Sequence, residues 1–382
     1  MTAPFAIRAP REILFGRGVA SHAARRIAGF GDRVALVHGA AALRARWLID
    51  ALRAEGCAVT PISCAGEPDI PMLGAAVAQA RAAGAQAVAA LGGGSALDLG
   101  KAVAALVPAR RPVLDHMEVV GAALPLDAPP LPFVAIPTTA GTGAEATKNA
   151  VIAAPDQRRK ASLRDDRMLA ALVIVDPALT DGAPKPVTLA CGLDALTQLI
   201  EAHVSCKATP FTDALTRPAI APCLRALRAL MEGDDAAARD AMAWASLSSG
   251  LALANGGLGA VHGFAGALGG WTGAAHGAIC GALLPHVLRA NAAALGDGPA
   301  SAKLAEILAL IAAEFGAPSP EAGLEALASW SAAQGLPGLG AMGLEAGDCA
   351  ALAEASRLSS SMKGNPVALD APALTAILRA AL

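Results

Sequence analysis

The stretch AQAVAALGGGSALDLGK, residues 85–101, decides the fold. An apolar run predicts a buried β-strand over 85–91, and the composition of 96–106 predicts a helix. Gly92, Gly93, Gly94 and Ser95 lie between them, where bare backbone can approach a pyrophosphate and the free N–H groups of the helix can bind it. The same glycines also suit a tight turn with no ligand, and they do not form the GxGxxG fingerprint of a plain Rossmann fold.

The segments on either side extend this pattern into a parallel sheet flanked by helices. Strands are predicted at 34–37, 58–62 and 132–136, and helices at about 41–54 and 72–83, so that strands and helices alternate. Short β-like runs at 149–153 and 172–175 predict hairpins that close the domain. The first part of the chain is therefore expected to be an α/β domain.

From about Val187 onward strand signals disappear, and Ala and Leu at helical spacing predict an all-α region to the last residue. The turn cluster at 181–184 and Pro186, which suits the first turn of a helix, place the boundary near residue 185. A chain of 382 residues also exceeds what one core usually supports. We therefore expect an α/β domain over 1–185 and an all-helical domain over 186–382.

Charge and composition exclude several classes of partner. The net charge is −2 and no run of Lys or Arg is present, so nucleic acid is not an expected partner. Residues 241–288 lack Asp, Glu, Lys and Arg, but Asn255, His262, His276 and many glycines predict the buried centre of a helical domain and not a membrane span. Seven cysteines without paired spacing and the absence of an apolar leader predict a cytoplasmic protein.

A second polar loop strengthens the phosphate-binding interpretation of the first. Asp98 and Lys101 lie in the first turns of the helix after the glycines, and the run 138–145, TTAGTGAE, follows the strand at 132–136. Because ligands bind at the carboxyl ends of parallel strands, both loops are expected on the ligand side of the sheet.

Taken together, these segments resemble the iron-containing alcohol dehydrogenase family over nearly the whole chain. The matching segments are ILFG at 13–16, GGGSALDLGK at 92–101, PTTAGTGAE at 137–145, DPALT at 176–180, GLDALT at 192–197, GAVH at 259–262 and GNPV at 364–367. The resemblance implies a Rossmann-like α/β domain plus an all-α domain, in the architecture shared with dehydroquinate synthases. It also implies hydride transfer between NAD or NADP and a small alcohol or aldehyde, and a homodimer is the default assembly for such enzymes.

The resemblance implies a cofactor role for seven residues, and the positions of Asp98 after the glycines and of Gly39 after the first strand add two more. Gly93, Gly94 and Ser95 would contact the pyrophosphate, Thr138, Thr139 and Thr142 the nucleotide, and Asp98 and Lys160 would lie on the cofactor side. At the end of the first strand NAD-preferring members often carry an Asp for the ribose, whereas this chain has Gly39. Loss of that carboxylate favours acceptance of NADP(H), with Arg44 or Arg46 as partners of the 2′-phosphate, although Gly39 also suits a simple turn.

A divalent metal site is predicted in the helical domain. Asp194 and Gln198 are four residues apart and project from one helix face, while His262 and His276 are 276 − 262 = 14 apart with a glycine-rich turn between them. The family pattern has an Asp, a His four residues later and two further His. Here Gln198 replaces one His, which weakens iron(II) binding, but Asp194, His262 and His276 still suffice for the three-ligand zinc site of related glycerol dehydrogenases.

The expected reaction uses this metal, either Fe²⁺ or Zn²⁺, as a Lewis acid toward the substrate oxygen, with the nucleotide in the cleft between domains. No catalytic residue beyond the metal ligands is assigned, because Gly266 stands where many members carry a further His. A metal-independent reductase such as maleylacetate reductase, a dehydroquinate synthase-like lyase and an inactive nucleotide-binding protein remain as alternatives.

Overall fold

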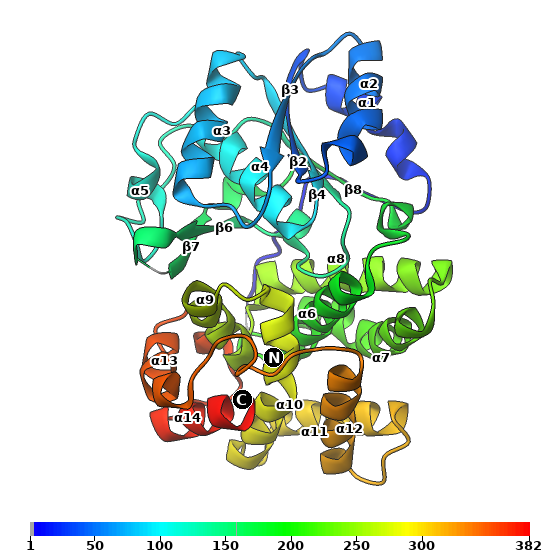
Figure 1. The fold of residues 1–382 in the computed structure, drawn as a ribbon, viewed down its shortest axis with the longest axis vertical. Helices are drawn as coiled ribbons and strands as arrows, with labels where there is room; N and C mark the ends of the chain where they lie inside the picture. Colours follow the sequence, from blue (N-terminus) through cyan, green and yellow to red (C-terminus); the bar gives the residue numbers. More distant parts are fainter. Residues whose placement is uncertain (1–3, 158) are drawn as a thin grey trace. The chain divides into compact units, whose positions relative to one another are not determined.

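The computed structural model describes residues 4–157 and 159–382, which form two compact units (Figure 1). The α/β unit comprises Arg8–Thr139 and Gly143–Asp181. The helical unit comprises Ala140–Thr142 and Gly182–Leu382, together with residues 4–7. The chain changes unit inside the turn cluster at 181–184, and the division at residue 185 itself stays a prediction.

The α/β unit is built on six parallel strands in the order β1-β8-β5-β4-β2-β3. Their bounds, in that order, are Ile13–Phe15, Leu172–Val175, Phe133–Pro137, Ala87–Gly92, Arg33–Gly39 and Ala58–Cys64. Strand β4 and the glycines that follow it therefore lie near the middle of the sheet. The predicted α/β class with a parallel sheet is confirmed.

Helices cover both faces of this sheet because its central strands are apolar on both faces, and β4, β5 and β8 are buried along their whole length. Val34 and Leu36 of β2 pack in one core with α1 (Ala23–Ala28) and α2 (Arg46–Ala54). On the opposite face lie α3 (Ile70–Ala82) and α4 (Gly94–Leu106), as Figure 1 shows. A Cβ on Gly100 would lie 2.7 Å from the Ala90 Cβ, so this glycine lets α4 lie directly on β4.

One predicted hairpin is wrong. Leu172–Val175 forms β8, which pairs in parallel with both β1 and β5 inside the main sheet. The hairpin of this region consists instead of β6 (Asn149–Ala154) and β7 (Arg159–Arg164), which pair antiparallel. All four residues of β8 are buried, as the interior of a parallel sheet requires. The unit also contains the short helix α5 (Val113–His116).

The second unit is all-helical, as predicted. Its helices are α6 (Lys185–Val204), α7 (Pro210–Glu232), α8 (Ala236–Gly256), α9 (Ala260–Thr272), α10 (His276–Ala294), α11 (Pro299–Glu314), α12 (Pro320–Ala333), α13 (Cys349–Ser356) and α14 (Ala371–Ala380). Proline in the first turn begins several of them, including α6, α7, α11 and α12. Helix α6 is almost entirely buried from Thr188 onward and forms the centre of the apolar core.

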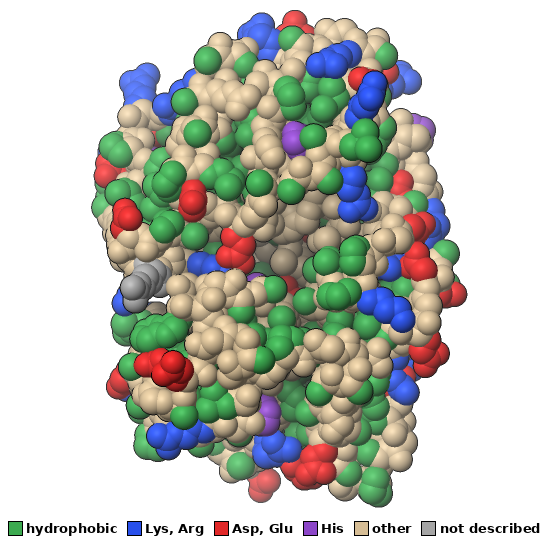
Figure 2. All heavy atoms as spheres, viewed as in Figure 1, with side chains coloured by type: hydrophobic (Ala, Val, Ile, Leu, Met, Phe, Trp, Pro, Cys, Tyr) green, Lys and Arg blue, Asp and Glu red, His purple; other side chains and the backbone are tan. Residues whose placement is uncertain are grey.

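Among the described residues no single helix is both long and apolar enough to span a bilayer. Helices α8 and α9 meet the length and composition test only as a pair, and a bend of 100° separates them. On the face drawn in Figure 2, Lys and Arg side chains are interspersed with Asp and Glu side chains and with apolar ones.

Candidate functional site

The sheet brings the predicted nucleotide-binding loops to one edge. Strands β2, β4 and β5 are neighbours, with Leu91 opposite His38 and Gly92 opposite Pro137. A Cβ on Gly92 would lie 3.5 Å from the Gly39 nitrogen, and the Thr138 N–H donates to the Gly92 carbonyl at 2.9 Å. The carboxyl ends of three adjacent strands therefore present Gly39, the glycine loop and the threonine loop together.

The glycine loop leads directly into a helix N-terminus. Gly93 is the extended N-cap residue of α4, and as a glycine it has no side chain to cap the first N–H groups of that helix. A Cβ on Gly93 would lie 3.2 Å from the Thr139 Oγ1, so a side chain at this position would crowd the threonine loop. Gly94 and Ser95 are half-buried. Uncapped N–H groups beside bare backbone suit a phosphate group.

Asp98 and Lys101 take part in structural contacts, and those of Lys101 are largely buried. The Asp98 carboxylate accepts from the Val151 N–H of β6 at 3.0 Å. The Lys101 ammonium donates to the Ala144 carbonyl at 2.6 Å, and to the Thr147 Oγ1 and the Asn149 carbonyl at 2.8 Å each. Lys101 therefore fixes the segment that follows the threonine loop, and a cofactor contact by Asp98 stays a prediction.

Burial shifts the pKa values of this group. It raises the pKa of Asp98 to about 6 and that of Glu145 to about 7, although Lys101 acts in the opposite direction on both. Burial also lowers the pKa of Lys101 to about 8, against the attraction of Asp98 and Glu145. These shifts follow from the difficulty of holding charge away from water.

The remaining predicted cofactor residues are dispersed. Thr138 and Thr139 are half-buried in the α/β unit, whereas Thr142 belongs to the helical unit. Lys160, on β7, has a nearly buried ammonium that forms an ion pair with the Glu67 carboxylate. Their cofactor roles stay predictions, as does that of Gly39.

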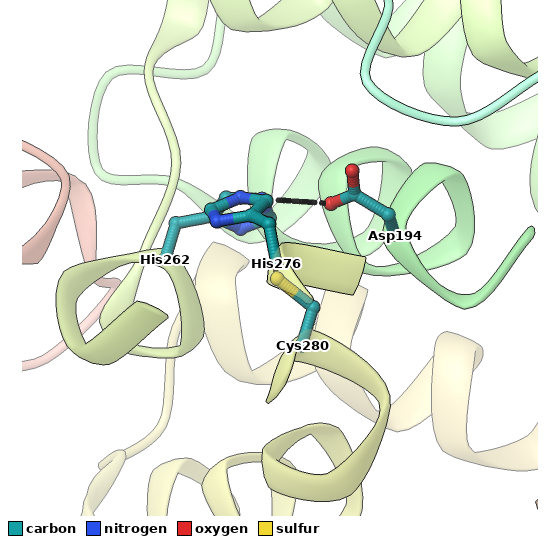
Figure 3. A group of neighbouring side chains, drawn as sticks. All are labelled: Asp194, His262, His276 and Cys280. Carbon is teal, nitrogen blue, oxygen red and sulfur yellow. Dashed lines mark hydrogen bonds and ion pairs between the residues drawn. The ribbon is translucent and has the colours of Figure 1, made fainter. Parts of the chain in front are cut away.

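The helical unit brings together Asp194 of α6, His262 of α9 and His276 of α10 (Figure 3). The Asp194 Oδ1 lies 3.2 Å from the His262 Nε2 and 4.0 Å from the His276 Nε2. Cys280, one turn after His276, directs its sulfur toward the same point, 3.7 Å from the His262 Nε2. One ligand atom from each of these four residues lies within 4.8 Å of all the others, which is an arrangement that could hold a metal ion.

Close helix packing produces this convergence. Gly277 follows His276 at the start of α10, and a Cβ there would lie 2.2 Å from the Ala190 carbonyl oxygen and 3.2 Å from the Asp194 Cβ. Only glycine permits this approach of α10 to α6, which brings His276 and Cys280 beside Asp194.

A buried carboxylate from α6 orients His262. Glu201 accepts from the His262 Nδ1 at 2.7 Å and from the Val261 N–H at 2.7 Å, and the Asn365 Oδ1 accepts from the Ala260 N–H at 3.1 Å. Because an ionised carboxylate only accepts hydrogen bonds, the Nδ1 atom of His262 carries a proton. The Nε2 atom therefore faces Asp194 and Cys280 in a fixed direction.

Gln198 lies one turn after Asp194, and both ends of its amide are engaged. Its Nε2 donates to the Gly141 carbonyl at 3.3 Å, and its Oε1 accepts from the Ser249 hydroxyl at 3.5 Å. Gln198 also hydrogen-bonds Asp194, and with His262 and His276 it lowers the pKa of that carboxyl against the opposing effect of burial. A ligand role for Gln198 stays a prediction.

Burial acts against a positive charge on His262, but Cys280, Asp194 and Glu201 raise its pKa well above the ordinary value. Burial raises the pKa of the Cys280 thiol to about 12. A divalent cation would relieve the burial of the Asp194 and Glu201 carboxylates beside this thiol.

Sequence reasoning missed two residues of this site, Cys280 and Glu201. Cys280 follows His276 by four residues, and Glu201 follows Asp194 by seven. Each therefore lies on a helix face that already carries a predicted ligand. That spacing was the available signal. It did not reveal that α9 begins directly against Glu201.

Comparison with known proteins agrees with the fold. Residues 10–177 match the family described as iron-containing alcohol dehydrogenase, and residues 188–382 match the C-terminal region of the Fe-containing alcohol dehydrogenase family. The chain is similar to the probable alcohol dehydrogenase EutG of Escherichia coli, with 39% identity over 64% of this chain and 61% of that relative. It therefore spans less than two thirds of the length of this relative.

Two further proteins align over more of their length. The NAD-dependent methanol dehydrogenase of Bacillus methanolicus is 32% identical over 78% of this chain and 77% of its own length. A crystal structure of a 1,3-propanediol oxidoreductase superimposes with a TM-score of 0.90 at 29% identity, covering 100% of both chains. The resemblance drawn from the sequence motifs is confirmed, and the chain belongs to the iron-containing alcohol dehydrogenase family.

Proposed function

We propose that this chain is a metal-assisted, NAD(P)-dependent alcohol dehydrogenase that interconverts a small alcohol and the corresponding aldehyde. The observation that carries the proposal is the convergence of Asp194, His262 and His276 on one point in the helical unit. Family membership and the names of the relatives, which include a methanol dehydrogenase and a propanediol oxidoreductase, support the same chemistry.

In this proposal Asp194, His262 and His276 hold one divalent metal. When bound, such an ion acts as a Lewis acid that stabilises negative charge developing on the substrate oxygen. Asp194 contributes a carboxylate kept ionised by its histidine neighbours. Glu201 holds the His262 ring in one tautomer and one orientation, so that no reorganisation is needed when the ligand binds.

The α/β unit supplies the nucleotide site. Gly93, Gly94 and Ser95 would offer N–H groups of α4 to the pyrophosphate, and Thr138 and Thr139 would contact the nucleotide beside them. The nicotinamide itself carries the hydride. Gly39 leaves open space at the end of β2 and no carboxylate that would repel a 2′-phosphate, which supports use of NADP(H) as well as NAD(H).

We further propose a cytoplasmic homodimer. The seven cysteines form no disulfide within the described part of the chain, which suits a reducing compartment, and a two-fold dimer is the commonest assembly of soluble enzymes. A metal-independent reductase is less well supported, because ligand atoms of Asp194, His262, His276 and Cys280 converge on one point and the chain belongs to a family described as iron-containing. The family comparison also does not favour the lyase or an inactive protein.

The test is to measure bound metal and nicotinamide turnover on the same preparations. Elemental analysis of metal-replete protein would be followed by oxidation of NADH and NADPH with a panel of small aldehydes, before and after chelation. We expect one divalent ion per chain, and loss of turnover on its removal and in His276→Asn. His286→Asn, on the same helix but outside the ligand cluster, should retain turnover and is the matched control.

Full turnover in protein verified to be metal-free would contradict the metal-assisted reaction and favour the metal-independent reductase. Metal binding without turnover across the whole panel would instead favour a protein that has lost catalysis.

A further inference from the structure

We propose that Cys280 is the fourth protein ligand of the metal centre, and that the centre therefore selects a thiophilic ion, zinc(II) or cobalt(II), over iron(II). The inference rests on the proposed function only in assuming that a metal binds at Asp194, His262 and His276. It goes further by assigning a thiolate ligand in this chain, where the residue at 198 is Gln.

The distances fit a single ion with four protein ligands, to which the substrate oxygen would add as a fifth ligand. A Zn–N bond of about 2.1 Å and a Zn–S bond of about 2.3 Å at the tetrahedral angle place the two ligand atoms about 3.6 Å apart. The Cys280 sulfur lies 3.7 Å from the His262 Nε2. A nitrogen and a carboxylate oxygen on the same ion should be about 3.4 Å apart, and the two observed distances to the Asp194 Oδ1 are 3.2 Å and 4.0 Å.

The orientation of Cys280 is fixed by its helix. It stands one turn after His276 on α10, so both side chains project from the same face toward Asp194 (Figure 3). The residue is fully buried, and its sulfur contacts the Nε2 atom of His262, which is the nitrogen that Glu201 leaves directed at the site.

Gln198 is placed differently. Its nitrogen donates to the Gly141 carbonyl, its oxygen accepts from the Ser249 hydroxyl, and the side chain also hydrogen-bonds Asp194. Withdrawing the oxygen to reach an ion would break the contact with Ser249, whereas the sulfur of Cys280 already lies among the ligand atoms. The cluster therefore supplies its fourth donor from α10 and not from α6.

A thiolate changes which metal the site prefers. Sulfur is a soft donor that favours zinc and similar ions, while Asp194 and two imidazoles suit zinc equally well. The alternative is that Cys280 is a small apolar residue of the core, as buried cysteines often are. The two interpretations differ in whether sulfur enters the coordination shell.

The experiment uses the full chain stripped of metal and titrated with cobalt(II) alone, monitored in the visible and near-ultraviolet. We expect one equivalent to bind with a thiolate-to-cobalt charge-transfer band that is lost in Cys280→Ser. The matched control is Cys223→Ser, since Cys223 is also fully buried in the helical unit but lies beside Met242, and this variant should keep the band. Zinc affinity, from chelator competition, should fall in Cys280→Ser by at least about tenfold, the lower limit for loss of an outer-shell partner.

A measurement on the unaltered chain does not depend on how the variants fold. X-ray absorption at the zinc edge should show a sulfur neighbour at about 2.3 Å. One bound ion without sulfur in its shell would overturn the assignment of Cys280 and leave the proposed dehydrogenase intact. Failure of the unaltered chain to bind cobalt or zinc at all would overturn both.

Discussion

At the residue scale, the ligand cluster depends on a side chain that would not itself touch a metal. Glu201 is buried, and its two carboxylate oxygens accept from the His262 ring and from the backbone at the start of α9. It thereby sets both the tautomer of a ligand and the position of the helix that carries it.

Replacing this carboxylate tests its positioning role. In Glu201→Gln only one acceptor oxygen remains, and the amide nitrogen opposes the His262 Nδ1 proton, so we expect metal affinity to fall about 10- to 100-fold. Chelator competition with zinc(II) measures this effect directly. Glu321→Gln, at an exposed position of α12, is the matched control and should bind zinc as the unaltered chain does. Equal affinities in the two variants would show that Glu201 serves only to cap α9.

A second residue-scale prediction concerns nucleotide choice. Gly39 ends β2, and a Cβ added there meets no atom within 4 Å, so Gly39→Asp should fold. The new carboxylate would accept from the ribose hydroxyls and repel a 2′-phosphate, and we expect kcat/KM for NADPH to fall at least about tenfold relative to NADH. Gly74→Asp on α3, which also has open space, adds the same charge elsewhere in the unit and should leave the ratio unchanged. An unchanged ratio in Gly39→Asp would place the ribose away from β2.

The site also shows which residues sequence reasoning could identify. The sequence predicts Asp194, His262 and His276 together, because two histidines in an apolar stretch match, with the upstream Asp, the ligand pattern of the family that the chain resembles. It does not predict Cys280, since a cysteine in such a segment is an ordinary core residue. Its proximity to His262 depends on the packing of α9 against α10, which spacing along the chain does not determine.

At the scale of elements, α4 is joined to the segment after β5 by a buried charged group. Lys101 on α4 donates to three acceptors between Ala144 and Asn149, with Asp98 and Glu145 nearby. This group fixes the threonine loop relative to the glycine loop, and it also makes the stability of the unit depend on pH.

The sign of that dependence follows from the pKa shifts. Folding raises the pKa of Glu145 from 4.5 to about 7 and that of Asp98 from 3.8 to about 6. The folded state therefore binds more protons than the unfolded state between these values, and stability present below pH 4.5 is lost as the pH rises through 7. Folding lowers the pKa of Lys101 from 10.5 to about 8. Between these two values the unfolded state binds more protons, so Lys101 makes the folded state more stable as the pH rises above 8.

Glu145→Gln should remove much of this loss. We expect the urea midpoint of the variant to change less between pH 4.5 and 7, and its free energy of unfolding at pH 8 to exceed that of the unaltered chain by about 1–3 kcal/mol. Glu55→Gln, at an exposed position after α2, provides the control and should follow the unaltered chain. If the free energy of unfolding of Glu145→Gln changed with pH as that of the unaltered chain does, Glu145 would not be the proton-binding group.

The elements themselves were largely predictable, with one instructive exception. Strands β2 to β5 and helices α2 to α4 arise from apolar runs and helical spacing close to the predicted ranges. The four residues of β8 were also recognised as β-like, but a short buried run does not say which strand it joins. Its position between β1 and β5 depends on pairing with residues far earlier in the chain, which no local signal records.

At the scale of the whole molecule, the two units carry different ligands in our proposal, and this can be tested in one scanning calorimetry experiment. Saturating zinc(II) should raise the melting temperature of the helical unit, and saturating nicotinamide nucleotide that of the α/β unit. At about 100 times the dissociation constant each ligand stabilises by about 2.7 kcal/mol. A single transition that both ligands shift equally would show that the chain unfolds as one cooperative unit.

The pairing of β1 with β8 has a consequence for synthesis of the chain on the ribosome. Ile13 lies opposite Val173, which is 173 − 13 = 160 residues away, and β8 separates β1 from β5. From the end of β5 at residue 137 to the start of β8 at residue 172 is 35 residues, or about 2–7 s of translation at about 5–20 residues per second. Throughout that interval β5 presents an unpaired edge, and protease sensitivity of stalled nascent chains should fall only once residue 175 has emerged. Although β1 precedes the other strands in the sequence, it is among the last strands of the sheet to pair. Until then, the unpaired strand edges of the nascent chain must be kept from aggregating.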